Sequence, residues 1–194
     1  MDSAVHDSVL ATVLDSLAAL GPSAVMVVCI DGPAGAGKTT LAQKLNAAIS
    51  DSAVVHMDDL YGGWAEGLGQ PLFERVLAQV VNPHLNGERI AFTAWDWHNN
   101  KWGPTKTVPT ARVLILEGVG ACSAPLRPQA ALTIFLDASS EVAMHRAIAR
   151  DGEQLRSELS RWVIAQDEFY VRDATRAQCD VVIAIDYSEN EISG

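Results

Sequence analysis

A glycine-rich segment at residues 32–39 constrains the fold of this chain more than any other feature. It reads Gly-Pro-Ala-Gly-Ala-Gly-Lys-Thr and matches the pattern G-x-x-x-x-G-K-[ST] at every fixed position. The apolar run Val25–Ile30 precedes it, and a helical pattern from Lys38 to about Ile49 follows it. A strand, a glycine loop and a helix in this order are the context in which the pattern binds phosphate. We therefore predict a phosphate-binding loop, or P-loop, between a buried strand and a helix.

The residue types in this loop suit the binding of a nucleoside triphosphate. Glycines allow successive backbone N–H groups to converge on phosphate oxygens without a clash from Cβ atoms. Lys38 supplies a mobile cation for the β- and γ-phosphates, and the Thr39 hydroxyl can join the coordination shell of Mg²⁺. The residues predicted to bind ATP are Gly32, Ala34, Gly35, Ala36, Gly37, Lys38, Thr39 and Thr40.

Two other apolar runs end in carboxylates. Val113–Leu116 is followed by Glu117, and Val54–Met57 is followed by Asp58 and Asp59. The carboxyl ends of strands in an open α/β sheet meet at one edge, where such folds bind ligands. Phosphoryl transfer needs a carboxylate that organises the metal and a base for the acceptor hydroxyl. We predict that Glu117 helps the P-loop threonine to hold Mg²⁺ and that Asp58 is the base, with Asp59 as the alternative.

The remaining pattern predicts one α/β domain over residues 1–194. Further buried strands are expected at Leu132–Leu136 and Val181–Ile185. Helical patterns alternate with the strands, and they include an amphipathic helix within residues 1–21 and a charged helical region at about 140–174. This alternation indicates a mainly parallel sheet.

The middle of the chain carries weaker signals. Pro71 opens a helical pattern that is expected to end before Pro83. Residues 89–111 mix Trp, Gly, Pro and Thr without a clear period, so no regular element is expected there. His56, in the run that leads to Asp58, is expected to be a satisfied core residue.

The charge balance and the cysteines limit the class of protein. The 24 Asp and Glu residues against 14 Lys and Arg give a formal net charge of −10. Such a surface repels phosphate backbones, so non-specific nucleic-acid binding is not expected. Residues 1–20 carry no Lys or Arg, which argues against a signal peptide, and no apolar run is long enough to predict a membrane span. Three cysteines without a CxxC pair predict core residues in a reducing, cytoplasmic environment.

Several short motifs follow one another in a fixed order and end in an Arg-bearing helix. They are the loop at 32–39, Asp58-Asp59-Leu60-Tyr61, Trp95-Asp96-Trp97 and Glu117-Gly118. This ordered set resembles the uridine kinase and phosphoribulokinase-like branch of the P-loop kinases, over about residues 24–186. The resemblance implies a three-layer α/β/α fold with a helical lid, in which five parallel strands take the order 2-3-1-4-5.

The resemblance also implies roles in binding the acceptor. Asp58 would take the proton of the acceptor hydroxyl, Asp96 would bind further hydroxyls, and Tyr61 would line the acceptor pocket. On the residues alone, a carboxylate between Trp95 and Trp97 is typical of sugar or nucleoside recognition, in which rings pack on the ligand and the acid accepts hydroxyl protons. Core packing is the alternative for both tryptophans.

Arg146 and Arg150 lie one helical turn apart and therefore share a helix face. With Arg156 and Arg161 they form the main positive cluster of an acidic chain. A kinase lid needs cations to neutralise the charge that spreads over the transferred phosphoryl group. We predict that Arg146 and Arg150 act with Lys38 in catalysis. A solvated helix with ion pairs to neighbouring acids is the alternative.

These features predict a cytoplasmic kinase that uses ATP and Mg²⁺ to phosphorylate a hydroxyl of a small nucleoside-like or polyol metabolite. A nucleoside monophosphate kinase is an alternative, because Ile30–Gly35 also resembles the cytidylate kinases. A phosphorylated acceptor demands cations. Residues 60–73 hold no Lys or Arg, whereas Arg75, Arg89 and Lys101 keep this alternative open.

Two alternatives involve no small acceptor. A nucleotide-binding regulatory protein usually needs an Asn-Lys-x-Asp element, and the nearest match, Asn100–Gly103, fails. A slow ATPase is the other. The Trp-rich segment 92–102 is expected to be either a pocket wall or a contact in a homodimer.

Overall fold

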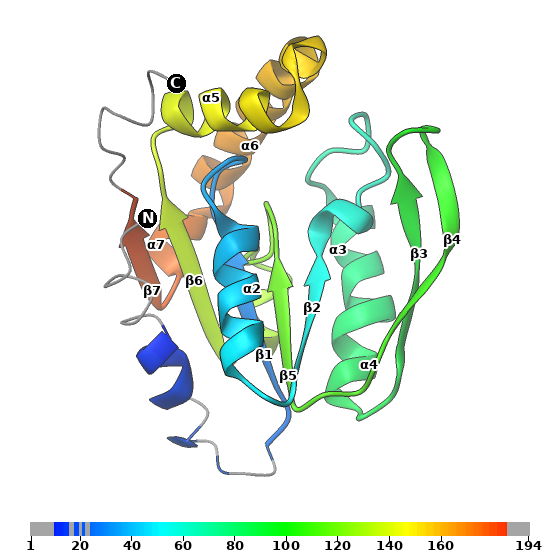
Figure 1. The fold of residues 1–194 in the computed structure, drawn as a ribbon, viewed down its shortest axis with the longest axis vertical. Coiled ribbons are helices and arrows are strands. Elements are labelled where there is room, and N and C mark those ends of the chain that lie inside the picture. Colours follow the sequence, from blue (N-terminus) through cyan, green and yellow to red (C-terminus); the bar gives the residue numbers. More distant parts are fainter. Residues whose placement is uncertain (1–9, 16–17, 20, 22–23, 186–194) are drawn as a thin grey trace.

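Five parallel strands form the central sheet. The computed structural model describes residues 10–15, 18–19, 21 and 24–185. The strands of the sheet are β1 (Met26–Asp31), β2 (Ser52–His56), β5 (Val113–Glu117), β6 (Leu132–Asp137) and β7 (Val181–Ala184). They lie in the order β2-β5-β1-β6-β7, and every neighbouring pair is parallel. Their carboxyl ends therefore share one edge of the sheet (Figure 1).

The sheet is buried on both faces, which explains why its strands are apolar without alternation. Along β1, Val27 and Cys29 belong to one core, and Val28 and Ile30 belong to the other. Three helices supply much of the cover. The first core receives side chains from α3 (Gln70–Val76) and α6 (Arg156–Asp173), and the second from α2 (Lys38–Ala48).

The segment without a clear sequence period forms an antiparallel hairpin outside the main sheet. Its strands are β3 (Ile90–Asp96) and β4 (Lys101–Val108). Ile90, Phe92 and Ala94 alternate into the first core, while most of β4 is exposed. Figure 1 shows the hairpin beside α3, at the β2 side of the sheet.

The strand order β2-β5-β1-β6-β7 differs in its numbers from the predicted 2-3-1-4-5, and this hairpin is the reason. The predicted order counts only the strands of the parallel sheet. The hairpin strands come third and fourth along the chain, so the later sheet strands carry the numbers five to seven. Counted within the parallel sheet alone, the strands lie in the order second, third, first, fourth and fifth.

The helix predicted to end before Pro83 continues past it. A π-helical turn at Leu77–Val81 follows α3 and leads directly into α4 (Asn82–Leu85). A proline inside a regular helix lacks one N–H donor, and its ring clashes with the carbonyl four residues earlier. The wider turn changes this register, because the N–H of Asn82 donates to the carbonyl of Leu77. Pro83 then lies in the first turn of α4, where proline is tolerated.

The charged region at 140–174 is helical, as predicted, and it is divided into two helices. Helix α5 (Ser140–Asp151) starts at Ser139, whose side chain accepts the N–H of Val142, and it ends at Gly152. With a φ of +100°, Gly152 occupies a conformation that favours glycine. A 3₁₀ turn then leads into α6. Figure 1 shows α5 and the beginning of α6 above the carboxyl edge of the sheet, and α6 then runs down behind the sheet.

Much of the helix predicted within residues 1–21 lies outside the described residues. Residues 10–15 and 18–19 are helical, and Val13 is fully buried in the second core. In the part of the chain that the structure describes, no helix is both long enough and apolar enough to cross a membrane. Cys29 and Cys122 are buried and Cys179 is partly buried, all three as free thiols.

Candidate active site

The P-loop connects β1 to α2 at the carboxyl edge of the sheet. Gly35 has a φ of +91°, and a Cβ atom there would lie 2.0 Å from the carbonyl oxygen of Ala143 in α5. Only glycine permits this approach of loop and helix. Of the residues predicted to bind ATP, Gly32 and Ala36 do not line the cavity beside the loop. Those that do line it are Ala34, Gly35, Gly37, Lys38, Thr39 and Thr40.

Lys38 is folded back against the loop. Its Nζ donates to the carbonyl oxygens of Gly32 at 2.8 Å and Pro33 at 2.9 Å. Burial lowers the pKa of Lys38, while the nearby carboxylates of Asp31 and Glu117 act in the opposite direction. The loop thus holds a buried cation where an anion on its N–H groups would need one.

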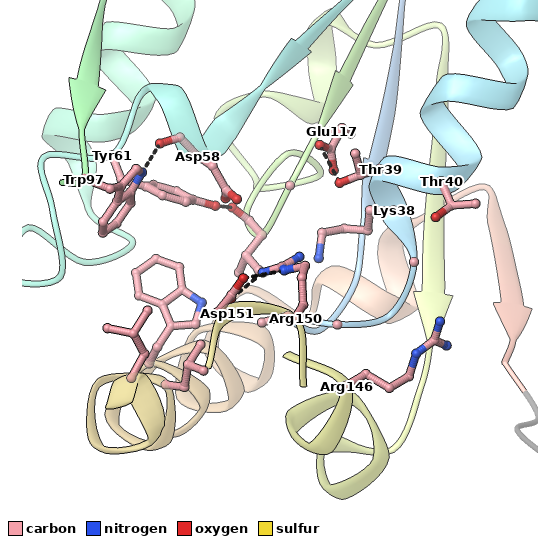
Figure 2. A pocket seen from close by; sticks show the side chains of 18 of the residues that line it. Lys38, Thr39, Thr40, Asp58, Tyr61, Trp97, Glu117, Arg146, Arg150 and Asp151 are labelled. Carbon is pink, nitrogen blue, oxygen red and sulfur yellow. Dashed lines mark hydrogen bonds and ion pairs between the residues drawn. The ribbon is translucent and has the colours of Figure 1, made fainter. Parts of the chain in front are cut away.

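The cavity beside the loop has a volume of about 740 Å³ and two chemically different ends. We call the part lined by the six P-loop residues named above the phosphate end. The ring end is lined by Tyr61, Trp64, Trp97 and Trp162. Figure 2 shows the two ends facing one another across the cavity. Of the four aromatic residues, sequence analysis singled out Tyr61 and Trp97 and missed Trp64 and Trp162.

Glu117 is the last residue of β5, and its side chain contacts the P-loop. The Thr39 hydroxyl donates to Oε1 of Glu117 at 3.1 Å, and Nδ1 of His56 lies 2.5 Å from the same oxygen. The hydrogen bond to Glu117 is the largest of the effects that raise the pKa of His56. The His56 side chain is 40% exposed. The expectation of a core histidine is therefore wrong, and His56 orients Glu117 instead.

Thr39 and Glu117 fit the needs of Mg²⁺. A hydroxyl and a carboxylate are hard oxygen donors, and Mg²⁺ at phosphate sites takes one or two carboxylates from the protein and further oxygens from the substrate. Among the described residues, no group of three or more His, Cys, Asp or Glu side chains could hold a metal by itself. The site therefore suits a cation that arrives with a phosphate ligand.

Asp58 lies in the 3₁₀ turn Met57–Asp59, directly after β2, and it lines the cavity between the two ends. Asp58 is exposed to the cavity by surface area, but the walls around it keep its carboxylate partly out of bulk water. This desolvation raises the pKa of Asp58, and the Lys38 ammonium group partly opposes the rise. Asp59 does not line the cavity, and its carboxylate accepts from Nζ of Lys106 at 2.8 Å. The geometry therefore favours Asp58 over Asp59 as the base.

Arg146 and Arg150 both line the cavity from α5. Figure 2 shows Arg150 close to Lys38, and Arg146 on the side of Thr40. Arg150 binds the carboxylate of Asp151 through Nε at 2.6 Å and Nη2 at 2.7 Å. The helical spacing therefore brings both arginines to the cavity, and their part in catalysis stays a prediction.

Arg156 and Arg161 lie elsewhere. Arg156 pairs with Glu153, and Nη2 of Arg161 lies 3.4 Å from Oε1 of Glu158. All four side chains lie outside the cavity lining, and both arginines are exposed. The alternative of a solvated helix with local ion pairs describes these two arginines.

A buried carboxylate behind the P-loop joins three segments. Oδ1 of Asp31 accepts the N–H groups of Gly32 at 2.7 Å and Gly120 at 3.0 Å and the hydroxyl of Tyr170 at 2.7 Å. Its Oδ2 accepts the N–H of Cys122 at 2.8 Å. Burial raises the pKa of Asp31, and these hydrogen bonds lower it in part. Asp31 thereby fixes the start of the P-loop, the segment after β5 and helix α6 relative to one another.

Helix α6 also contacts the P-loop directly. Gln166 is fully buried, and its Oε1 accepts the N–H of Ala34 at 2.8 Å. Leu159, Trp162, Gln166 and Tyr170 follow one another at helical spacing, so one face of α6 extends from the ring end to Asp31. Sequence analysis missed this face, although the spacing of these residues was a visible signal.

Asp96, which the family resemblance places at the acceptor, lies at the hairpin turn. Its carboxylate accepts the backbone N–H of Asn99 at 3.0 Å and the side-chain Nδ2 at 2.8 Å. These hydrogen bonds lower the pKa of Asp96. Asp96 is not among the residues that line the cavity, whereas its neighbour Trp97 is. We therefore leave Asp96 out of the candidate site.

Comparison with known proteins gives a distant sequence relative. No protein-family model matches the chain. The inorganic pyrophosphatase TTM1 of Arabidopsis thaliana is 25% identical over 134 residues, which cover 66% of this chain and 21% of that protein. The chain thus spans about a fifth of the length of this curated relative.

Solved structures show a closer likeness in fold. A possible uridine kinase from Bacillus stearothermophilus is 20% identical with a TM-score of 0.69, and the match covers 92% of this chain and 97% of that one. A putative fructose transport system kinase from Silicibacter sp. TM1040 is 20% identical with a TM-score of 0.73, covering 92% and 98% of the two chains. The chain therefore shares its fold with these two structures, both of which are described as kinases.

Proposed function

We propose that the protein transfers the γ-phosphoryl group of ATP to a hydroxyl of a small, uncharged metabolite. One observation carries this proposal: a P-loop and the carboxylate of Asp58 face the same cavity, whose far end is lined by aromatic rings. A protein that only binds a nucleotide needs neither a base nor a second binding region opposite the phosphates. The likeness in fold to the uridine kinase-like proteins supports the same reaction class.

In the proposed reaction, the P-loop holds the triphosphate. Lys38, Arg146 and Arg150 neutralise the negative charge of the transferred phosphoryl group, which is the main task of a kinase site. Asp58 orients the acceptor hydroxyl and accepts its proton. A raised pKa suits this role, because a base works best when its pKa approaches the working pH.

Thr39 and Glu117 would hold Mg²⁺ in this scheme, with His56 fixing the orientation of Glu117. The cation, when bound, screens the charge of the β- and γ-phosphates. Helices α5 and α6 would act as the lid. Gln166 and Tyr170 connect α6 to the P-loop, so nucleotide binding and the position of the lid would be coupled through these contacts.

The positions of the basic residues favour an uncharged acceptor over a nucleoside monophosphate. The guanidinium of Arg75 binds Glu66 at 2.5 and 2.9 Å and donates to the carbonyl of Leu60. Arg89 donates to a threonine in the hairpin, and Lys101 lies in the same hairpin. None of these three cations is among the described residues that line the cavity.

The proposal is tested by ADP release from Mg-ATP in the presence of single candidate acceptors. We expect stimulation by an unphosphorylated alcohol and loss of that stimulation in Asp58→Asn, with Asp59→Asn as the matched control. Stimulation by nucleoside monophosphates alone would indicate a nucleotide kinase. Tight Mg-ATP binding without acceptor-dependent turnover would favour a regulatory protein.

A further inference from the structure

The four aromatic side chains at the ring end of the cavity form a cluster in which each ring pairs with two others. Trp97 comes from the end of the hairpin, Trp162 from α6, and Tyr61 and Trp64 from the segment after β2. Ring centroids are 5.0 Å apart for Tyr61–Trp162 and for Trp64–Trp97, 5.9 Å for Trp64–Trp162 and 6.5 Å for Tyr61–Trp97. All four pairs are tilted or edge-to-face, which are arrangements that aromatic rings prefer. The rings therefore hold one another in place, although separate segments supply them.

This aromatic cluster lies next to Asp58, the proposed base. The indole Nε1 of Trp97 donates to the backbone carbonyl of Asp58 at 2.9 Å, which fixes the ring next to that residue. Trp64 and Trp97 are each 37% exposed, and both line the cavity, so they present ring surface to a ligand. A molecule that places a hydroxyl against Asp58 therefore lays its remaining atoms against these rings (Figure 2).

Of the polar atoms on the four rings, the Tyr61 hydroxyl and the Trp97 indole N–H have protein partners, and the indole N–H groups of Trp64 and Trp162 can only donate, so they cannot accept the proton of a ligand hydroxyl. The Tyr61 hydroxyl donates to the carbonyl of Val119 at 2.7 Å, and the carboxylate of Asp151 binds Arg150. The apolar side chains of Leu155 and Leu159 also line the cavity. An acceptor with several hydroxyls would leave some of them unpaired here, at a cost of about 1–3 kcal/mol for each buried group. The ring end therefore disfavours sugars and open-chain polyols.

A ribose meets the same difficulty. A nucleoside carries two ribose hydroxyls besides the one that is phosphorylated. The carboxylate that the family resemblance assigns to them, Asp96, binds Asn99 at the hairpin turn instead. A planar ring with a single hydroxymethyl group needs no such partner, because its ring packs on aromatic surface and its hydroxyl meets Asp58.

We propose that the acceptor is an aromatic or heteroaromatic alcohol without a sugar, whose planar ring packs at the ring end. This inference rests on the proposed kinase activity. In the transfer, the acceptor oxygen forms a bond to the γ-phosphorus, and the bond from that phosphorus to the β–γ bridging oxygen breaks. The electron pair of the broken bond leaves with ADP, and the hydroxyl proton passes to the carboxylate of Asp58. The product is a phosphate monoester of the ring alcohol.

The first test compares four probes with the intact protein: hydroxymethylpyridine, benzyl alcohol, uridine and D-fructose. ADP release from Mg-ATP gives kcat/KM for each probe, and quenching of tryptophan fluorescence in the presence of Mg-ADP gives binding independently of turnover. We expect kcat/KM to be at least about tenfold higher for a ring alcohol than for uridine or D-fructose, because two unpaired hydroxyls at about 1 kcal/mol or more each already correspond to more than tenfold.

The second test uses a matched pair of hairpin tryptophans. Trp102 is 40% exposed, similar to Trp97, but it packs on Trp95 and does not line the cavity. We expect Trp97→Leu to lower kcat/KM for the ring alcohol about three- to tenfold, mainly through KM, since an aromatic pair contributes roughly this much beyond its area. Trp97→Phe should restore part of the loss. Trp102→Leu should leave KM unchanged, and the Kd of Mg-ADP should stay the same in all three variants.

The outcomes separate this inference from the proposed function. Preference for uridine or D-fructose, with ADP release that depends on Asp58, overturns the acceptor class and keeps the kinase. Binding of a ring alcohol that depends on Trp97, without any ADP release, supports the ring site and contradicts the kinase. Absence of binding by both ring alcohols, or equal effects of Trp97→Leu and Trp102→Leu, overturns the inference.

Discussion

Replacing Tyr170 by phenylalanine removes one hydroxyl from the network that holds the P-loop, the segment after β5 and α6 together. That hydroxyl donates to Asp31 at 2.7 Å, and Asp31 is fully buried. Hydrogen bonds to charged groups contribute about 1.5–3 kcal/mol to stability. We expect Tyr170→Phe to lower the free energy of unfolding by this amount, which corresponds to a decrease in Tm of about 3–12 °C for a chain of this size.

Tyr61→Phe is the matched control, because it makes the same chemical change elsewhere in the same core. The Tyr61 hydroxyl also forms a hydrogen bond of 2.7 Å, but to the neutral carbonyl of Val119. A bond of this kind contributes about 0.5–1.5 kcal/mol. Urea unfolding at mildly alkaline pH, with equal m-values for the three proteins, gives both differences. A loss in Tyr170→Phe that is no larger than the loss in Tyr61→Phe would refute the role assigned to the Asp31 carboxylate.

Three further predictions concern the chemistry. Lys38→Ala should reduce acceptor-dependent ADP release at least about a hundredfold, since it removes a cation that binds the phosphates. The far-ultraviolet circular dichroism should stay unchanged, because the substitution removes no contact between helices. Retained turnover would contradict the role assigned to Lys38. Because desolvation raises the pKa of Asp58, kcat should fall on acidification at a pH above the ordinary aspartate range, where the protonated base cannot accept a proton. Arg150→Gln should move this decrease in kcat to higher pH, because the charge of Arg150 lowers the pKa of Asp58. A decrease that stays at the same pH would argue against Asp58 as the base. Glu117→Gln should raise the Mg²⁺ concentration at half-maximal activity about tenfold, and an unchanged value would exclude Glu117 from the metal site.

The phosphate end could be predicted from the sequence because its determinants are local. The glycine pattern fixes the loop within eight consecutive residues, and it follows an apolar strand. Asp58 and Glu117 end other strands of the same parallel sheet, so the shared carboxyl edge brings them to the loop. Arg146 and Arg150 needed only helical spacing to lie on one face.

The ring end could not be predicted in the same way. Trp64, Trp97 and Trp162 come from a loop, a hairpin and a helix, and no local pattern connects them. The hairpin itself escaped prediction because β4 is mostly exposed and lacks an alternating apolar pattern. A register irregularity between Thr93 and Trp95 also changes which side chains follow the alternation of β3.

The same hairpin explains why the resemblance places Asp96 differently from the structure. The resemblance carries residue types and their order along the chain, but not the shape of the turn at 97–100. In that turn the backbone N–H and the side chain of Asn99 take both carboxylate oxygens of Asp96. The neighbouring Trp97 lines the cavity instead.

The proposed reaction requires Asp58 to act on an acceptor held in the same cavity as the nucleotide phosphates. The most direct measurement compares the wild-type protein with Asp58→Asn, using the alcohol that best stimulates ADP release and recording kcat together with the Kd of Mg-ATP. We expect kcat to fall about a hundredfold or more, as for the loss of a general base, while the Kd changes less than about twofold. An unchanged kcat, or equal losses in turnover and Mg-ATP binding, would contradict this role of Asp58.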